Sequence, residues 1–322
     1  MKNNKKIFFL IEIVMAMMVL IIVGVMVRGN ANKDLDRVSV IVQNSDDYQW
    51  SGFKYGLKMA AQDQGIEMFV VSTGARLTVE EEKRLIEDEI ENGTDAVIVQ
   101  PIPGDDTEKM LKKMKKKIPI MLLEDVITKD KEGSGFLTTK PDNYLMGKDL
   151  GKELLKDYGE NLKNKTIGIV SEMKGSKAVM NRNQGFRDCI KGRGAKIAWS
   201  VSDSFEEEDD SLGVWPKVDI VIALDDNSLV AAGKCLAADD LHGACVYGIG
   251  NSMEAFYYLD TGFTECLVVP DEFNSGYQSL TEIKKEIGYF RHAKSKLVSH
   301  TVVRRDTLYS KENQKILFTM SQ

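Results

Sequence analysis

From residue 38 onward, short apolar runs rich in β-branched residues alternate with longer stretches whose apolar residues recur every three or four positions. The short runs predict strands, and the longer stretches predict amphipathic helices. The first series contains the predicted strands Val38–Val42, Ile66–Val71, Ala96–Gln100 and Ile118–Leu123, and the predicted helices Trp50–Gln64, Val79–Asn92 and Asp106–Lys116.

The pattern restarts near residue 140. The second series contains the predicted helices Asn143–Tyr158, Ser176–Lys191, Asn227–Ala238 and Glu254–Asp260, and the predicted strands Thr166–Val170, Ile197–Val201, Val218–Leu224, Ala244–Gly248 and Thr264–Val268. Nearly continuous apolar strands that alternate with helices are typical of parallel sheets covered on both faces. Because the strands are too many for one modest sheet, the predicted fold class is α/β with two doubly wound parallel-sheet lobes.

An apolar run at the N-terminus, Ile7–Val27, is interrupted only by Glu12 and is long enough to cross a bilayer as a helix. Three lysines within the first six residues precede it, so the positive-inside rule keeps the short N-terminus in the cytoplasm. We therefore expect a transmembrane signal anchor in the cell membrane, with the rest of the chain extracytoplasmic. A cleaved signal peptide remains an alternative, because Gly29-Asn30-Ala31 offers small residues to a peptidase.

Composition narrows the classes of function. The net charge is −6 with both signs interspersed, and the lysines of Lys112–Lys117 fit one solvated helix face, so nucleic acid is not an expected partner. The cysteines lack metal-ligand spacing; Cys235 and Cys245 either form a disulfide or, as we favour, remain buried free thiols. The chain shows neither a nucleophile–base motif nor a P-loop. We predict a protein that is not an enzyme and has no catalytic residue, metal or cofactor.

Polar and aromatic residues gather directly after the predicted strands, where open α/β sheets bind ligands. Carboxylates accept hydrogen bonds from hydroxyl groups, and aromatic faces cover the apolar patches of a sugar ring. The positions therefore predict a polyol or sugar site. An alternative is that Asp225, Asp226 and Asn227 cap the next helix, which we favour for Asp226 and Asn227. The candidate ligand-binding residues at these positions are Asp47, Trp50, Gln100, Glu124, Asp125, Phe205 and Asp225.

Six short motifs, in order along the chain, carry a family resemblance: Lys54-Tyr55-Gly56, Val99-Gln100-Pro101, Ile118-Pro119-Ile120, Pro141-Asp142-Asn143 followed by Gly147, Asn181–Phe186 and Tyr309–Gln314. With them, the chain from about Arg37 to Gln322 resembles the type 1 periplasmic sugar-binding proteins, especially the ribose-binding branch, which share their fold with the core of lactose-repressor-type regulators.

The resemblance implies two lobes that close on a small ligand around a three-segment hinge. The crossovers would fall near Glu124–Thr128, Gly250–Ser252 and Val268–Asp271. On the same grounds, the domains are 1–33 for the cytoplasmic stub, anchor and linker, 34–125 with 269–294 for the N-terminal lobe, and 126–268 with 295–322 for the C-terminal lobe.

The resemblance also implies roles for the candidate residues. Trp50 and Phe205 would stack on the two sides of a sugar ring, and Arg182 would donate to ring and hydroxyl oxygens. The remaining members would bond hydroxyl groups: Asp47, Gln100 and Glu124, with Asp225 at a position where the family usually has Asn.

The chain departs from the ribose branch at several of these positions. Asp125 stands where a basic residue is usual, Gly250 replaces an Asp, and Val268 replaces a Gln. The segment between Phe205 and Val218 is also shorter than the family's helix. With four acidic candidates against Arg182, the sequence predicts a net acidic cleft and makes an amino sugar or other cationic small molecule a candidate ligand.

Two functions follow from the resemblance. The first is a solute-binding protein that presents a sugar-like small molecule to the permease of an ABC importer. The second is a sensory subunit whose closure is read by a membrane histidine kinase. An enzyme or a module that binds nothing is a third, less favoured alternative.

Overall fold

The computed structural model describes residues 13–19, 35–74, 77–104, 106–124, 135–159, 161–172, 175–202, 215–239, 241–287 and 292–317. The chain divides into two units, Met1–Leu35 and Asp36–Gln322. In the first unit, residues 13–19 are helical, and the rest of the predicted span Ile7–Val27 lies outside the described residues. None of the helices formed by the described residues is both long and apolar enough to cross a membrane.

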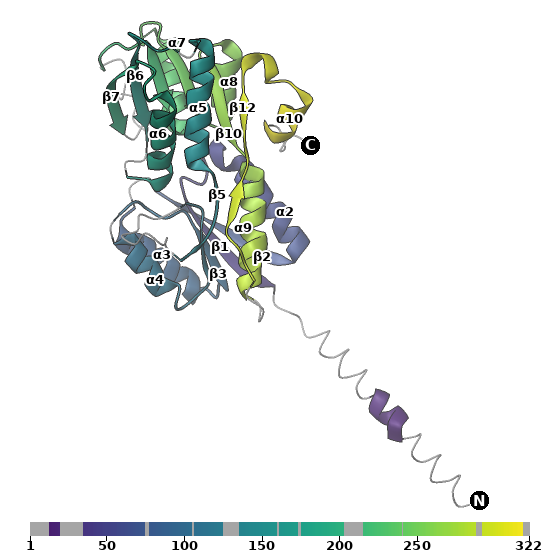
Figure 1. Cartoon of the computed structure of the whole chain (residues 1–322). Coiled ribbons are helices and arrows are strands. Elements are labelled where there is room, and N and C mark those ends of the chain that lie inside the picture. Colours follow the sequence, from purple (N-terminus) through teal and green to yellow (C-terminus); the bar gives the residue numbers. More distant parts are fainter. Residues whose placement is uncertain are drawn as a thin grey trace, which may run out of the picture. The chain divides into compact units, whose positions relative to one another are not determined.

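The second unit contains two six-stranded sheets, each at the centre of one lobe (Figure 1). The first sheet has the order β11-β5-β4-β3-β1-β2, and its neighbours pair in parallel. Its strands are β1 (Asp36–Gln43), β2 (Ile66–Thr73), β3 (Ala96–Val99), β4 (Ile120–Leu122), β5 (Leu137–Pro141) and β11 (Lys296–Val298).

Helices cover both faces of this first sheet. On one face, α2 (Ser51–Gln64) and α9 (Glu272–Ile287) contribute Phe53, Leu57 and Leu280 to a buried core with β1 and β3. On the other face, α3 (Val79–Glu91) and α4 (Thr107–Met114) pack against the same strands through their own apolar stripes. The central strand β3 is buried along its whole length because helices cover it on both sides.

The second sheet repeats this layering in the order β12-β10-β9-β8-β6-β7, except that β12 pairs with β10 in antiparallel orientation. One core lies under α5 and α6, and the other lies under α7 and α8. The strands are β6 (Thr166–Ser171), β7 (Lys196–Ser202), β8 (Ile220–Ala223), β9 (Cys245–Ile249), β10 (Cys266–Pro270) and β12 (His300–Val303), and the helices are α5 (Asn143–Asp157), α6 (Lys177–Ile190), α7 (Asp226–Ala237), α8 (Met253–Thr261) and α10 (Lys311–Leu317).

The chain passes between the lobes at three points: Asp142, between β5 and α5; Asp271, between β10 and α9; and Ser299, between β11 and β12. The last two are joined, because the Asp271 amide donates to the Ser299 carbonyl at 3.0 Å. The predicted crossover at Val268–Asp271 is confirmed.

The other two predicted crossovers were wrong. β4 and β5 belong to one sheet, so the chain does not change lobe at Glu124–Thr128; β9 and β10 likewise share a sheet on either side of Gly250–Ser252. As a result, β5 and β11 lie in the first sheet, although the predicted boundaries give both segments to the second lobe. Both strands are short and partly polar, and their membership rests on pairing with distant strands.

Each lobe contains one very close pair of helices beside a crossover. In the first lobe, a Cβ added to Gly56 of α2 would meet the Phe273 carbonyl oxygen at 2.0 Å, and one added to Gly276 of α9 would meet that of Phe53 at 2.1 Å. In the second lobe, Gly147 of α5 and Gly185 of α6 make the corresponding approaches at 1.9 and 2.0 Å. Only glycine allows the two backbones to come so close.

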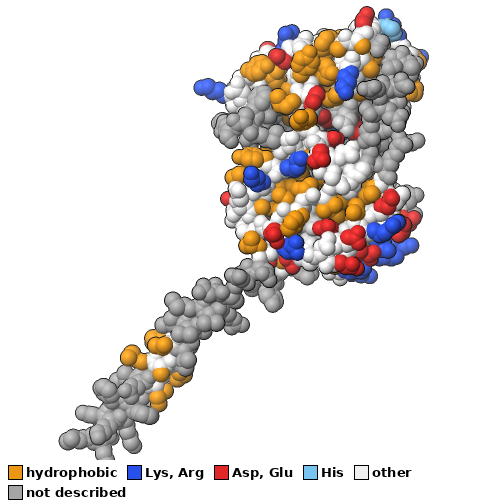
Figure 2. All heavy atoms as spheres, turned by 180° about the vertical axis from the view of Figure 1, so that it is seen from behind, with side chains coloured by type: hydrophobic (Ala, Val, Ile, Leu, Met, Phe, Trp, Pro, Cys, Tyr) orange, Lys and Arg blue, Asp and Glu red, His pale blue; other side chains and the backbone are white. Residues whose placement is uncertain are grey.

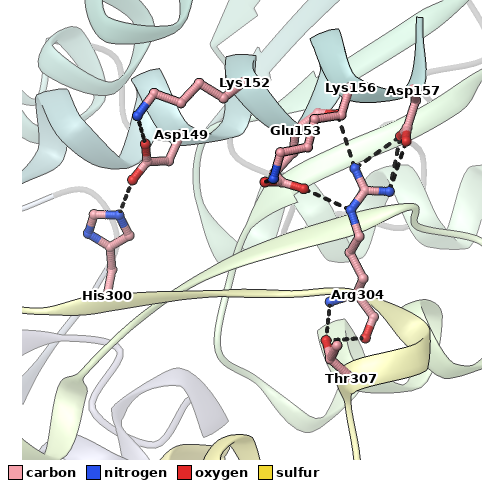
Figure 3. Close-up of polar contacts among 8 residues, drawn as sticks. All are labelled: Asp149, Lys152, Glu153, Lys156, Asp157, His300, Arg304 and Thr307. Carbon is pink, nitrogen blue, oxygen red and sulfur yellow. Dashed lines mark hydrogen bonds and ion pairs between the residues drawn. The ribbon is translucent and has the colours of Figure 1, made fainter. Parts of the chain in front are cut away.

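Charged side chains fasten β12 to α5 just beyond two of the crossovers (Figure 3). Arg304 donates from Nε to Glu153 Oε2 at 2.8 Å and from Nη1 to Asp157 Oδ1 at 3.0 Å. His300 Nε2 lies 2.8 Å from Asp149 Oδ2. Because Glu153 is buried, these contacts satisfy a carboxylate that would otherwise be costly in the interior.

The surface and the thiols fit the composition. On the face seen in Figure 2, acidic and basic side chains are interspersed with apolar ones over both lobes. All four cysteines are free thiols, and Cys235 and Cys266 are buried. Cys235 and Cys245 are thus free thiols, as favoured, but only Cys235 is buried, and Cys245 is partly exposed.

Candidate functional site

A cavity lies between the two lobes, at the carboxyl ends of their strands. It encloses about 790 Å³, a volume that includes open solvent at its mouth. Its lining comes from the segments that follow β1, β3, β4, β6, β8, β9 and β10. This is the edge at which open parallel sheets bind ligands.

Six of the eight predicted residues line this cavity: Asp47, Trp50, Gln100, Glu124, Arg182 and Asp225. Asp125 and Phe205 lie outside the described residues, so the predicted second stacking aromatic and the predicted inverted charge stay predictions. The described members come from both sheets, although more than 170 positions separate Asp47 from Asp225 along the chain.

Trp50 is held in place by its own lobe. Its indole Nε1 donates to the Gln43 carbonyl at 2.9 Å, and its ring meets the buried Phe53 ring edge-on, with centroids 5.5 Å apart. Gln100 is tied to the same segment, because its Oε1 accepts from the Gln43 amide at 3.0 Å. The short helix Tyr48–Trp50 therefore presents a fixed aromatic side chain at the cavity.

Arg182, on α6, is oriented by two neutral acceptors of the second lobe. Its Nε donates to Asn143 Oδ1 at 2.7 Å, and its Nη1 donates to the Leu224 carbonyl at 2.9 Å. Within the described part of the chain, Nη2 has no hydrogen-bond acceptor. The protein thus fixes the position of the guanidinium in the lining of the cavity.

Asp225 serves the protein itself, as the capping alternative predicts. Its Oδ1 accepts from the Ser228 amide at 3.0 Å and caps α7, and its Oδ2 accepts from the Glu172 amide at 2.8 Å. Asp226 is buried and accepts from the backbone amides of Asn251 and Ser252. For Asp226, the favoured capping alternative is wrong, because this carboxylate holds the loop after β9 and does not cap α7.

Two hydrogen bonds cross the cavity between the lobes. Ser176 Oγ, at the start of α6, donates to Glu124 Oε2 at 3.1 Å, and Asn251 Nδ2 donates to the Gln49 carbonyl at 2.7 Å. Burial raises the pKa of Glu124, while the neighbouring Arg182 and the Ser176 hydroxyl lower it. Polar groups of the two lobes are therefore in direct contact at two points of the cavity lining.

Sequence reasoning missed two acidic residues of the lining, Glu172 and Glu272. Glu272 begins α9 at the Asp271 crossover, and burial raises its pKa to about 7, against the opposing effect of Arg182. The signal for Glu272 was present, since it follows β10 just as the predicted residues follow their strands. In the described part of the chain, no group of His, Cys, Asp and Glu could hold a metal ion.

Comparison with known proteins now identifies the family. The family model for the periplasmic binding protein domain matches residues 38–288. The chain belongs to this family. Membership of a periplasmic binding protein family places the domain outside the cytoplasm, in agreement with the resemblance in the sequence. No match to the chain was found among curated proteins.

Solved structures share the fold at low sequence identity. A carbohydrate transporter solute-binding protein from Agrobacterium radiobacter, in complex with D-arabinose, is 17% identical with a TM-score of 0.78, covering 89% of this chain and 100% of that chain. GanP, a glucose–galactose binding protein from Geobacillus stearothermophilus, is 18% identical with a TM-score of 0.74, covering 86% and 100%. The XylFII–LytSN complex is 18% identical with a TM-score of 0.71, covering 84% and 98%. These likenesses confirm the two-lobed α/β fold.

Proposed function

We propose that this chain is an extracytoplasmic solute-binding protein that holds a sugar-like small molecule between its lobes and presents it to an ABC importer. The observation that carries the proposal is the cavity itself, whose polar lining is contributed by both lobes. A ligand bound there contacts both lobes at once, so its binding energy favours the closed arrangement.

The candidate ligand contacts follow from the geometry. The fixed indole of Trp50 supplies an aromatic face, and Nη2 of Arg182, which has no acceptor among the described residues, supplies a donor to ring or hydroxyl oxygens. Glu124 and Asp47 supply acceptors. Asp225 contributes less than its position implied, because both of its carboxylate oxygens already accept hydrogen bonds from backbone amides.

The N-terminal run Ile7–Val27 is, in this proposal, a transmembrane anchor that keeps the binding domain at the cell membrane. Intact-mass spectrometry of the chain from a membrane fraction tests this point. A mass that includes Met1–Ala31 supports the anchor, whereas a chain that begins after Ala31 supports a cleaved signal peptide.

A sensory subunit is the second candidate function, and one observation favours it. The XylFII–LytSN complex, which pairs a protein of this fold with another chain, is among the similar structures. Deletion of the gene separates the two functions: loss of uptake of the bound sugar indicates import, whereas unchanged uptake with a lost transcriptional response to that sugar indicates sensing.

Thermal unfolding of the full-length chain against pentoses, hexoses, amino sugars and polyols tests the proposed binding. A ligand at 100 times its dissociation constant adds about 2.7 kcal/mol to the free energy of unfolding. We expect this stabilisation to be lost in Arg182→Ala and Trp50→Ala and retained in Arg187→Ala, whose side chain bonds to Asn183 on the same helix outside the cavity. Stabilisation that survives both cavity substitutions contradicts the assignment of the site.

A further inference from the structure

The described lining of the cavity is strongly unbalanced in charge. It contains a single basic side chain, Arg182, and the guanidinium of that residue donates to an amide oxygen and a backbone carbonyl. Six carboxyl-bearing residues face it: Asp47, Glu124, Glu172, Asp225, Asp226 and Glu272. A surplus of carboxylates in a partly enclosed space is unfavourable unless a cation or a proton compensates it.

Besides Glu124, four of these six side chains accept hydrogen bonds from neutral groups of the protein. Asp225 and Asp226 accept from backbone amides, while Glu172 accepts from Asn227 Nδ2 and Asp47 accepts from Gln49 Nε2. Neutral donors stabilise a carboxylate without cancelling its charge. These hydrogen bonds therefore leave the charge of their carboxylates in place.

Glu272 stands out because it accepts no hydrogen bond from the described residues. Its structural counterpart in the second lobe is Asn143: each residue begins the helix after a crossover, directly after a Pro-Asp pair. Asn143 accepts a hydrogen bond from Arg182. The residue of the first lobe that corresponds to Arg182 is the buried, apolar Phe53. Each of the two residues lies three positions before a close-contact glycine, on the helix that follows the equivalent strand of its own sheet. The first lobe thus has the acceptor without the donor.

Glu124 is a second carboxylate of the cavity that has no cationic hydrogen-bond donor among the described residues. Its described hydrogen bond comes from the Ser176 hydroxyl. Its negative charge repels that of Glu272, which lines the same cavity. Among the described residues, Lys140 and Lys177 also lie near this region, and Lys140 acts on Glu124 at longer range. Neither lysine lines the cavity.

We propose that the cavity is selective for a cationic sugar-like ligand, an amino sugar whose ammonium group pairs with Glu272 and Glu124. The inference rests on the function proposed above and narrows its ligand class. The ammonium takes the place of the donor that Arg182 provides in the other lobe. The ring and hydroxyl groups contact Trp50 and Arg182, which a bare metal cation would leave without partners. A charge-assisted hydrogen bond is roughly twice as strong as a neutral one, so the amine should dominate selectivity.

Calorimetric titration of the full-length chain in a nonionic detergent tests the inference with matched ligands. The ligands are glucosamine, galactosamine and mannosamine, each compared at pH 7 with its neutral parent sugar and its N-acetyl derivative. We expect at least one amine to bind roughly ten- to a hundredfold more tightly than both neutral forms. Neutral sugars that bind as tightly as the amines overturn this inference and leave the proposed function standing. Binding by none of the compounds contradicts both.

Glu272→Gln assigns the preference to a residue, and Glu286→Gln on the same helix, away from the cavity, is its control. We expect Glu272→Gln to reduce the preference for the amine at least tenfold while neutral sugars bind as before. Glu124→Gln provides a second, independent variant with the same expected direction. An amine preference that is unchanged in both cavity variants overturns the inference, and intact unfolding transitions exclude misfolding as the cause.

Discussion

The chain enters α5 of the second lobe through Pro141-Asp142-Asn143, and it enters α9 of the first lobe through Pro270-Asp271-Glu272. In both corners the proline ends a strand and the aspartate accepts from an amide in the first turn of the helix. The third residue differs: Asn143 is bonded to Arg182, whereas the position that matches Arg182 in the first lobe is Phe53. The Pro-Asp pair, which both segments share, determines the fold at the crossover. The third residue, which differs, determines the chemistry of the cavity.

The correspondence continues along the two helices. Glu153 of α5 lies six residues after Gly147, and Glu282 of α9 lies six residues after Gly276. Both glutamates are buried, and each accepts from the lysine three residues later. What differs is the further partner, which is the forked guanidinium of Arg304 in the second lobe and the ammonium of Lys296 in the first. The features that recur in both lobes therefore determine their common fold.

The largest expected effect comes from separating the closely packed pair of helices that each lobe contains. Gly185→Ala places a Cβ 2.0 Å from the Tyr144 carbonyl oxygen, so the helices must separate. We expect a loss of about 3 kcal/mol in the free energy of unfolding, measured by urea denaturation. Gly56→Ala should cost a similar amount in the first lobe.

Gly52→Ala is the matched control, because its Cβ meets Glu272 Cβ at 3.4 Å, an ordinary contact. It should change stability by less than about 1 kcal/mol. A Gly185→Ala protein as stable as Gly52→Ala would show that the helices do not pack as closely as the structure has them.

An intermediate effect is expected from the basic partners of the two buried glutamates. Arg304→Ala removes hydrogen bonds to both Glu153 and Asp157 and leaves Lys156 as the cation on Glu153 (Figure 3). We expect this substitution to cost about 2 kcal/mol, measured by chemical denaturation.

The first-lobe counterpart, Lys296→Ala, should cost about 0.5 kcal/mol. Its nitrogen lies 3.4 Å from Glu282, which keeps the Lys285 side chain and the Lys294 amide as donors. Equal costs for the two substitutions would contradict the view that the second lobe relies on the forked contact.

An effect smaller than that of Arg304→Ala is expected from the pH dependence contributed by Glu272. Burial raises its pKa to about 7 in the folded chain, above the ordinary value of 4.5, so the folded state holds the proton more tightly than the unfolded state. Stability due to this group therefore falls as the pH rises from about 4.5 to about 7. Because the side chain is only partly buried, we expect Glu272→Gln to gain about 1 kcal/mol over wild type at pH 8 and nothing at pH 4. Thermal unfolding across this range, with Glu286→Gln as control, measures it; parallel pH profiles for wild type and Glu272→Gln would refute it.

The sequence predicted the elements with strong local signals. The apolar run Ala96–Gln100 became β3, and the amphipathic stretch Trp50–Gln64 became α2 with shifts of one residue. β5 was missed because Leu137–Pro141 carries threonines, a lysine and a proline in place of an apolar run. The lobe boundaries depended on β5 and β11, whose sequence signals are weak. Because both strands were missed, two of the predicted crossovers were misplaced.

The site was predicted as far as strand ends reveal it. Trp50, Gln100 and Glu124 were found because they follow parallel strands, at the edge where open α/β sheets bind ligands, whereas Arg182 was found through the family resemblance. The capping role of Asp225, and the fact that Glu272 accepts no hydrogen bond from the described residues, depend on which donors lie nearby. Those donors come from distant parts of the chain. Single-sequence patterns hold no such information, whereas the internal correspondence between Pro141-Asp142-Asn143 and Pro270-Asp271-Glu272 was legible in the sequence.

The most direct test of the central claim is an NMR titration of the Glu272 carboxyl carbon in the full-length chain, with selectively labelled glutamate and Glu272→Gln for assignment. We expect a pKa of about 7 without ligand, which falls when glucosamine is added and is unchanged by glucose. A Glu272 carboxyl that titrates at its ordinary value, or that responds equally to the amine and to the neutral sugar, would contradict the account.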